Sequence, residues 1–562
     1  MNGDIPIESH FNKEQFFSDI ENAKKRTLTD GSEEAYLRAR GLRYVIEAPE
    51  GSDQESVGAR VRDFLHRDFQ VERLFEDLEG VPVPEELRQF YLIIYEGVMT
   101  EDLEQNPYEA AYELLLNTPF KSVEPDLAFS GDPISQWTNP SPQKQAMTDR
   151  AWALRNIRAD KAWLIQPTNG LQDGEGISIA HLDTGWTDHV DLDQSNIDLN
   201  RAMDYIDQRG NAKDPMNYRG NKGHGTRTGS VIMSKGGVNS IIPPGTDQPG
   251  TITGVARKVT YVPVRCIRSV VIIFNSDVAR AVYYATANGC DVISMSLGGR
   301  PMTALRLAIQ DAVLKDLIVV CAAGNHVRFV VWPARYDETI ALAASNVADQ
   351  PWSGSSRGRK VDITAPGEDV WVAEPGVNGV GDKQGNGTSY ATAHVAGVAG
   401  LWLSFNGKQK LRQTAINSRT IVQELFRSAI KRTARVPGGW NRRKFGAGIV
   451  NVEALLTQPL TLSPFSGYSK EDIDYIGSLL NEEDPEAGTR LLDRLLIRDQ
   501  YVWKDLEPVF GHELANILFE SPELIDRLKQ MSIETSEQID ISAARDLLEE
   551  RMSETFKAAL GW

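Results

Sequence analysis

Five short and almost entirely apolar runs recur through the middle of this 562-residue chain and constrain its fold more than any other feature. Helical patterns separate the runs, and each run is too apolar to leave one face in water. Strands covered on both faces are typical of a parallel sheet flanked by helices. The runs are residues 177–182, 259–265, 292–295, 317–322 and 339–344. We therefore expect residues 151–456 to form an α/β domain with a mainly parallel sheet.

The region before this domain has a different pattern. Residues 41–130 alternate in the order strand, helix, strand, strand, helix, strand, which predicts an α+β sandwich of the ferredoxin-like kind. The second helix opens with Asn106-Pro107, a cap followed by a first-turn proline. The expected strands are 43–48, 69–75, 90–96 and 120–127, and the expected helices are 55–65 and 106–116. Residues 1–40 are polar and charged, with a helical stretch near 13–25, and we interpret them as an N-terminal arm.

Two further segments complete the expected organisation. Residues 131–150 are rich in Ser, Pro, Asp and Gln, which is typical of an exposed linker. Residues 465–562 carry apolar stripes at helical spacing and predict a small all-helical domain. From residue 461 onward the chain holds 22 Asp and Glu against 10 Lys and Arg, and thus most of the net charge of −18. The stripes can pack on one another or on the α/β domain.

Composition excludes several classes of protein. A net charge of −18 without clustered Lys and Arg argues against a nucleic-acid partner. The N-terminus lacks the pattern of a secretory signal, and no stretch is long and apolar enough to span a bilayer. The three cysteines, Cys266, Cys290 and Cys321, are odd in number and lack CxxC spacing, which indicates buried thiols rather than disulfides or a zinc site. We therefore expect a cytoplasmic protein with no membrane partner.

Four polar residues stand where chemistry is possible. Asp183 ends an apolar run, His224 lies between two glycines before an expected helix, Asn325 ends another run, and Ser389 begins an Ala-rich helix. Each alone has a commonplace structural explanation, as a turn residue, a loop residue or a helix cap. Together they supply a hydroxyl nucleophile, a base, a carboxylate that orients the base, and an amide donor for an oxyanion.

The order and the surroundings of these residues resemble the subtilisin-like serine proteases, or subtilases. The matching segments are DTG at 183–185 with DHVDL at 188–192, GHGT at 223–226, SMSLGG at 294–299, AAGN at 322–325 and GTSYATAHVAG at 387–397. The likeness continues through WPARYDETIALAA, ITAPG and FGAGIVNVEALL, and so covers essentially all of residues 151–456. Departures from the family's usual residues occur at Arg227-Thr228, Tyr390 and Ala393, which flank the expected chemistry without removing it.

The resemblance implies a serine endopeptidase that works through an acyl-enzyme. In it Ser389 is the nucleophile, His224 the general base and then acid, and Asp183 the group that fixes the imidazole tautomer. Asn325 shares the oxyanion with the backbone N–H of Ser389. The alternative is an inactive scaffold with this fold that acts through its helical tail, but the presence of all four residues favours the enzyme.

The resemblance also implies a cleft for a protein or peptide substrate. The edge at 296–299 pairs with an extended substrate by β-augmentation. The implied substrate-binding residues are Ser296, Leu297, Gly298, Gly299, Ala322, Ala323, Gly324 and Val331. Val331 stands where many relatives have Gly, and no acidic residue there calls for a basic P1 side chain. We expect a preference for small or medium apolar P1 residues.

Regions outside the α/β domain suggest regulation. Residues 41–130 resemble the propeptides of the same family. The resemblance implies that they hold the enzyme latent, with residues 128–137 in the substrate cleft until the linker is cut. The alternative is an unrelated accessory domain. The acidic tail is expected to bind a regulatory protein partner, or else to act as a structural clamp on the protease. No cofactor is required, and structural calcium is possible because relatives often bind it, although spacing assembles no ligand set.

Overall fold

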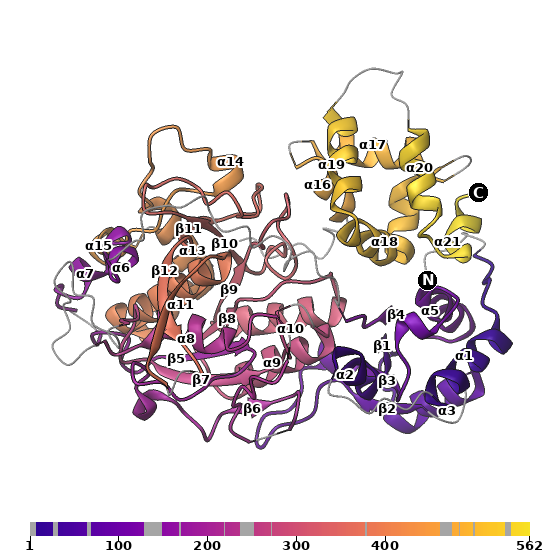
Figure 1. The fold of residues 1–562 in the computed structure, drawn as a ribbon, viewed down its shortest axis with the longest axis horizontal. Coiled ribbons are helices and arrows are strands. Elements are labelled where there is room, and N and C mark those ends of the chain that lie inside the picture. The colour runs from indigo at the N-terminus through magenta and orange to yellow at the C-terminus, as the bar shows by residue number, and fades with distance from the viewer. Residues whose placement is uncertain are drawn as a thin grey trace.

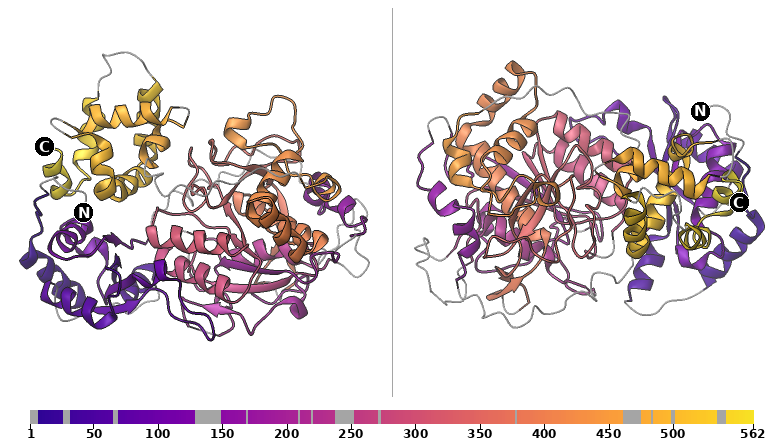
Figure 2. Two further views of the ribbon diagram at one scale, coloured as in Figure 1. Left: turned by 180° about the vertical axis from the view of Figure 1, so that it is seen from behind. Right: turned by 90° about the horizontal axis from the view of Figure 1, so that it is seen from above.

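Three units follow one another along the chain (Figure 1). The computed structural model describes residues 7–25, 32–64, 69–128, 149–167, 170–208, 210–218, 220–236, 252–270, 273–376, 379–460, 475–482, 484–497, 501–533 and 541–562. The N-terminal α+β unit lies at one end of the central α/β unit, and the C-terminal helices lie over the junction of the two (Figures 1 and 2).

The central unit is built on a seven-stranded sheet in which every recorded strand pair is parallel. The strands, in the order β11-β10-β9-β8-β5-β7-β6, are β11 (Ile363–Pro366), β10 (Ile340–Ser345), β9 (Ile318–Ala322), β8 (Val292–Met295), β5 (Ser178–Asp183), β7 (Thr260–Arg265) and β6 (Met203–Asp204). This confirms the predicted parallel α/β domain. All five apolar runs become strands of this sheet, and the short edge strands β6 and β11 join them. A separate hairpin is formed by β12 (Val370–Glu374) and β13 (Gly381–Gly385).

Helices cover both faces of this sheet. Side chains of β5 alternate between two cores: Ile179 packs with α11, whereas Ala180 packs with α9 and α10. One face holds α9 (Asn275–Ala287) and α10 (Thr303–Leu314). The other face holds α6 (Trp152–Asn156), α7 (Ala159–Ala162), α8 (His224–Met233), α11 (Thr388–Asn406), α12 (Lys408–Asn417), α13 (Val422–Arg432) and α15 (Val452–Thr457). The short elements η2 (Gln194–Asn196) and α14 (Arg442–Phe445) lie in connections.

The N-terminal unit is a four-stranded antiparallel sheet in the order β2-β3-β1-β4. Its elements are α1 (Lys13–Lys25), α2 (Glu33–Arg40), β1 (Leu42–Glu47), α3 (Gln54–Phe64), β2 (Gln70–Arg73), α4 (Glu85–Arg88), β3 (Phe90–Tyr95), η1 (Thr100–Asp102), α5 (Pro107–Asn117) and β4 (Ser122–Pro125). Helix α1, which we expected to belong to a peripheral arm, buries Phe16 and Ile20 in the same core as Tyr95. The Phe16 and Tyr95 rings meet edge to face at 5.8 Å.

The sheet of the N-terminal unit packs on α9 and α10. Phe75 meets Tyr283 of α9 with ring centroids 5.6 Å apart, within one continuous hydrophobic core. Charged groups seal the same contact: Asp277 of α9 is buried and forms ion pairs with Arg40 and Arg43. The N-terminal unit is therefore joined to the α/β unit by both apolar packing and buried charge.

The C-terminal unit consists of helices only. They are α16 (Tyr475–Leu480), α17 (Pro485–Leu496), α18 (Trp503–Glu520), α19 (Pro522–Ile533), α20 (Ser542–Glu549) and α21 (Glu554–Ala559). They pack on one another around α18, whose Phe510 stacks on Phe556 at 4.5 Å. The same helix reaches α5, because Phe510 also meets Tyr112 edge to face at 4.9 Å. Phe519 of α18 also lies against Phe329 of the α/β unit with ring centroids 6.3 Å apart, so the helices pack both on one another and on the α/β unit, the two arrangements that the sequence left open.

Two expectations from composition concern single residue types. Cys266, Cys290 and Cys321 are buried free thiols, as the sequence predicts. Within the described residues, no helix combines the length and the apolar character that a membrane span requires.

Candidate active site

The carboxyl edge of the parallel sheet gathers the residues singled out from the sequence. β9, β8 and β5 are neighbours and run in the same direction, so the residues that follow them meet at one edge. Asp183 ends β5, Ser296 follows β8, and Asn325 lies just beyond β9. Open α/β sheets place ligand sites at this edge. Helices α8 and α11 bring His224 and Ser389 to it at their N-terminal ends.

Asp183 and His224 form a buried hydrogen-bonded pair. His224 Nδ1 lies 2.8 Å from Asp183 Oδ1 and 2.9 Å from Oδ2, and both residues are buried. Because the carboxylate accepts, Nδ1 carries the proton and Nε2 keeps its lone pair. Burial acts to raise the pKa of Asp183, but the charge and hydrogen bond of His224 outweigh it and hold that pKa below its usual range. The imidazole is thus fixed in the tautomer of a general base.

A glycine permits this close approach of β5 and α8. A Cβ placed on Gly225 would lie 2.1 Å from the Gly185 carbonyl oxygen, so no larger residue fits after His224. Thr184 ties the two segments further: its hydroxyl donates to Asp214 at 2.8 Å and accepts from the Gly225 N–H at 3.1 Å. The glycine that flanks His224 in the sequence is therefore explained by packing against the Asp183 turn.

Ser389 is the second residue of α11, where backbone N–H groups have no acceptor within the helix. Its hydroxyl lies 3.4 Å from the Ser296 carbonyl oxygen, and the Ser296 hydroxyl donates back to the Ser389 carbonyl at 3.0 Å. Within the described residues, no hydrogen bond joins Ser389 to the ring of His224. A 3.4 Å contact is at the weak end of hydrogen-bond geometry, so it does little to hold the side chain in this rotamer.

Asn325 is oriented by the residue next to Ser389. Its Oδ1 accepts from the Thr388 backbone N–H and from the Thr388 hydroxyl, each at 2.9 Å. Two donors on one atom identify that atom as the amide oxygen, so Nδ2 must be the free donor of the side chain. Thr388 was not singled out from the sequence, and its position beside the serine is the only local signal for it.

The expected substrate-binding residues also lie together. Gly299 N–H donates to the Trp332 carbonyl at 2.7 Å, and Val331 N–H donates to the Ala323 carbonyl at 3.0 Å, so three separate segments are joined by main-chain bonds. A Cβ on Gly298 would lie 2.5 Å from Val331 Cγ2, and one on Gly324 would lie 3.1 Å from Val331 Cγ1. The Val331 side chain therefore fills the space between the two glycine segments.

One polar residue behind the pair was missed by sequence reasoning. His181, inside the buried strand β5, places Nε2 2.8 Å from the Thr228 hydroxyl and 3.6 Å from Asp183 Oδ2. Burial is the main cause that lowers the pKa of His181 to about 4, so this second imidazole is neutral at ordinary pH. A histidine within an otherwise apolar run was the signal that could have identified it.

Arg227, one of the departures from the family pattern, is buried on the far side of α8. It forms an ion pair with Glu374 of the β12–β13 hairpin at 3.1 Å and donates to Asn221. The hydroxyl of Tyr390, another departure, packs against Gly385 of that hairpin, where a Cβ would lie 2.3 Å away. Both substitutions thus contact one hairpin rather than the reacting atoms.

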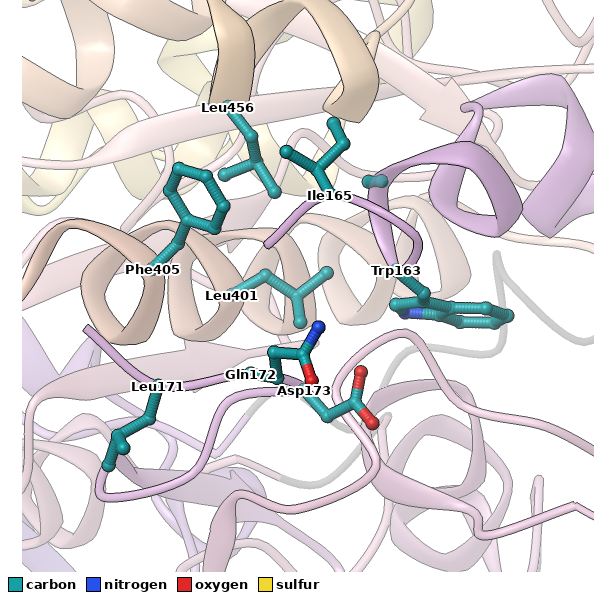
Figure 3. Close-up of a pocket in the computed structure, with 9 residues that line it drawn as sticks. Trp163, Ile165, Leu171, Gln172, Asp173, Leu401, Phe405 and Leu456 are labelled. Carbon is teal, nitrogen blue, oxygen red and sulfur yellow. The ribbon is translucent and has the colours of Figure 1, made fainter. Parts of the chain in front are cut away.

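Other candidate sites lie elsewhere or are absent from the described residues. Figure 3 shows a crevice of about 10 Å³ whose lining includes Leu401 and Phe405, at the end of α11 opposite to Ser389. A space of this size holds at most about one water molecule. No group of three or more His, Cys, Asp and Glu side chains that could hold a metal ion occurs in the part of the chain that the structure describes.

The fold and this edge of the sheet define a class, the subtilisin-like α/β serine hydrolases. A family model described as the subtilase family matches residues 174–448. Alkaline elastase YaB of Bacillus sp. (strain YaB) is 32% identical over 342 residues, which cover 60% of this chain and 79% of the relative. Subtilisin of Bacillus pumilus is 32% identical over 289 residues, covering 50% and 91%, respectively. The intracellular serine protease of Paenibacillus polymyxa is 28% identical over 321 residues, covering 56% and 88%.

These similarities show the family. The chain belongs to the subtilases and is a subtilisin-like serine endopeptidase.

Proposed function

We propose that this endopeptidase cleaves peptide bonds with Ser389 as nucleophile, His224 as general base and Asp183 as the group that orients the imidazole. The observation that carries the proposal is the Asp183 bond to His224 Nδ1, because in the neutral imidazole it leaves Nε2 as the nitrogen that can accept a proton. The proposal requires the Ser389 side chain to rotate away from the Ser296 carbonyl so that its hydroxyl donates to that nitrogen. The 3.4 Å contact with the carbonyl is weak and opposes this rotation little.

The reaction proceeds in two halves. Ser389 Oγ bonds to the scissile carbonyl carbon while its proton passes to His224 Nε2, and the carbonyl oxygen becomes an oxyanion. Asn325 Nδ2 and the Ser389 N–H stabilise that oxyanion. The carbon–nitrogen bond then breaks as His224 returns the proton to the leaving amine. A water molecule then gives a proton to the same imidazole as its oxygen bonds to the acyl carbon. The bond between this carbon and Ser389 Oγ breaks, and His224 returns the proton to Oγ, which restores the hydroxyl.

The substrate lies extended along residues 296–299, which supply main-chain hydrogen bonds. Val331 occupies space between Gly298 and Gly324, and this supports a preference for small or medium apolar P1 side chains. The substrate class is therefore a protein or peptide segment with a modest apolar residue before the cleaved bond.

The enzyme is held latent by its N-terminal unit. Support comes from where that unit ends: the Leu127 carbonyl accepts from Arg300 at 3.0 Å, and Arg300 directly follows the substrate edge at 296–299. The N-terminal unit thus delivers the chain to the rim of the cleft. The segment 128–137, which we expected in the cleft, lies outside the described residues except for Ala128. Cleavage of the linker is the activating event, and we place the enzyme in the cytoplasm, in line with the printed name of its Paenibacillus relative.

Covalent labelling tests the nucleophile and the resting state together. A fluorophosphonate probe is applied to the full chain and to Ser389→Ala, and intact mass reports both adduct and linker cleavage. We expect label only on chains that keep Ser389 and have been cut between residues 128 and 149. Absence of label after linker cleavage would refute the nucleophile. Rapid labelling of uncut chains would refute latency.

A further inference from the structure

Among their contacts with the protease unit, the C-terminal helices meet the segment from Arg328 to Arg335. This segment contains Val331, which lies between the two glycine segments of the cleft. No tail residue reaches Ser389 or His224 by any recorded contact within the described residues. Within the described residues, the tail therefore meets the cleft region through this segment and through the ion pair of Glu520 with Arg300, which directly follows residues 296–299.

Arg335 is one end of this connection. Its side chain is only 1% exposed, and its guanidinium pairs with Glu482 at 3.4 Å and donates to the Ser478 hydroxyl at 3.1 Å. Both partners come from the tail. A buried guanidinium that loses its carboxylate is strongly destabilising, and burial already lowers the pKa of Arg335. The position of Arg335 thus depends on the tail.

Glu482 occupies a specific seat on the protease surface. Its Oε2 accepts from the Arg359 backbone N–H at 2.6 Å, in addition to the Arg335 pair on Oε1. A Cβ on Gly358 would lie 2.4 Å from Glu482 Oε1, so the seat is open only because residue 358 is glycine. The Glu482 side chain is therefore held at a defined position on the protease unit by two contacts and by the space that Gly358 leaves.

Phe329 is the other end of the connection. Its ring is 1% exposed because Phe519 of α18 lies against it at 6.3 Å and Lys529 of α19 lies over it, with Nζ 5.6 Å from the ring centroid. Lys529 Nζ also donates to the Arg328 carbonyl at 3.2 Å. Aromatic packing and a main-chain bond from the tail therefore hold the start of the segment.

Val331 lies between these two ends. Its N–H bond to Ala323 fixes it to the β9 side of the cleft, and Phe329 and Arg335 fix the chain on either side of it. We propose that the C-terminal helical domain is a working part of the substrate cleft: Glu482 and Phe519 are positioning residues that set the place of Val331 and so the P1 selectivity. This inference rests on the proposed peptidase function. In this proposal the C-terminal helices bind the protease unit of their own chain and not an external partner.

The test uses the full chain with Glu482→Gln, Phe519→Ala and, as control, Arg490→Gln, whose exposed ion pair lies elsewhere on the tail. Hydrogen exchange of amides 328–335 is compared with that of β5 in the same samples. We expect the two tail variants to speed exchange in 328–335 by about tenfold and to leave β5 and the control unchanged. Unchanged exchange in both tail variants would overturn the proposal.

Selectivity is measured on linker-cut samples with two peptides that differ only in an Ala or Leu at P1. We expect the ratio of the two kcat/KM values to move by about threefold or more in the tail variants, mainly through KM. An equal loss for both peptides would contradict a role in selectivity. Fluorophosphonate labelling of the same samples separates the two hypotheses, because unlabelled wild type refutes the nucleophile whereas the exchange result stands without it.

Discussion

Thr388 holds the amide oxygen of Asn325 with two hydrogen bonds, one from its backbone N–H and one from its hydroxyl, both 2.9 Å long. The residue before the proposed nucleophile, Ser389, therefore orients the side chain that we propose as an oxyanion donor. The same threonine accepts from the Gly324 N–H at 3.2 Å, which links the β9 loop to the first turn of α11. The proposed oxyanion site thus draws on two residues, Asn325 and Thr388, that are 63 residues apart in sequence.

This relationship predicts a graded series of rate losses. Asn325→Ala removes the donor and is expected to lower kcat by about 100- to 1,000-fold, the range known for this family, with little change in KM. Thr388→Val keeps the backbone N–H donor but removes the hydroxyl that donates to Asn325 Oδ1. We therefore expect kcat to fall by about tenfold. Steady-state kinetics with one peptide measures both, with the exposed Thr457→Val as control. Equal losses for Asn325→Ala and Thr388→Val would contradict a purely orienting role for Thr388.

His181 predicts a pH dependence of stability. Its pKa is about 4 in the folded protein against 6.5 for an ordinary histidine, so the unfolded chain binds more protons between these values. Stability is therefore fully present above pH 6.5 and is lost as pH falls through 4, by up to about 3 kcal/mol. His181→Val should remove this part of the acid sensitivity in denaturant unfolding at pH 7 and pH 4.5. The exposed His10→Val should keep the wild-type dependence of the unfolding free energy on pH. If His181→Val also kept that dependence, His181 would not be the cause of the acid sensitivity.

Glu513, at the interface between the tail and the N-terminal unit, predicts that stability falls as pH rises, which is the opposite of the effect of His181. Burial raises its pKa to about 7 even though Tyr112 donates to it at 2.7 Å and Ser553 at 2.9 Å. Because the folded value lies above the ordinary 4.5, the contribution of Glu513 is fully present below pH 4.5 and is lost as pH rises through 7. In thermal unfolding, Glu513→Gln should therefore narrow the stability difference between pH 6 and pH 8. The exposed Glu523→Gln is the matched control and should leave that difference intact.

Val331 predicts how the P1 preference can be changed. Val331→Gly removes the side chain that fills the space between Gly298 and Gly324. Substrates with larger apolar P1 residues should therefore be cleaved with a higher kcat/KM. We expect the kcat/KM ratio of a Phe peptide to an Ala peptide to rise by about tenfold or more. Profiling with a library that varies only P1 measures the change. A wild-type enzyme that already prefers Phe or Arg would show that Val331 does not limit the site.

Asp277 predicts how latency can be weakened. It is buried between Arg40 and Arg43, and its pKa is held below the usual range because these two charges outweigh the effect of burial. Asp277→Asn leaves Arg40 without its carboxylate and Arg43 with only Asp126, so the N-terminal unit should dissociate more readily and fluorophosphonate labelling of Ser389 should start earlier. Glu72→Gln removes a more exposed pair with Arg280 in the same interface and should have little effect. Identical labelling time courses for all three proteins would argue against inhibition by this unit.

Much of the central unit was predictable from local pattern. The runs that became β5, β7, β8, β9 and β10 are buried on both faces, so their apolar character extends over nearly all of their residues and identifies them without knowledge of their neighbours. The four reacting residues were each ambiguous alone, and only their order and surroundings made the argument. Edge strand β6 could not be found in this way, because its two residues carry no run to detect.

The sequence by itself therefore determined the parallel α/β fold and the set of candidate catalytic residues, since both depend on local composition and on order along the chain. Only the tertiary structure decided which groups support them. Thr388 on Asn325, Thr228 on His181 and Glu482 on Arg335 are contacts between segments that are distant in sequence. The residues that make such contacts are polar side chains of ordinary kind, and their role is set by what packing places opposite them. For the same reason α1, which looked like a peripheral arm, became part of a core.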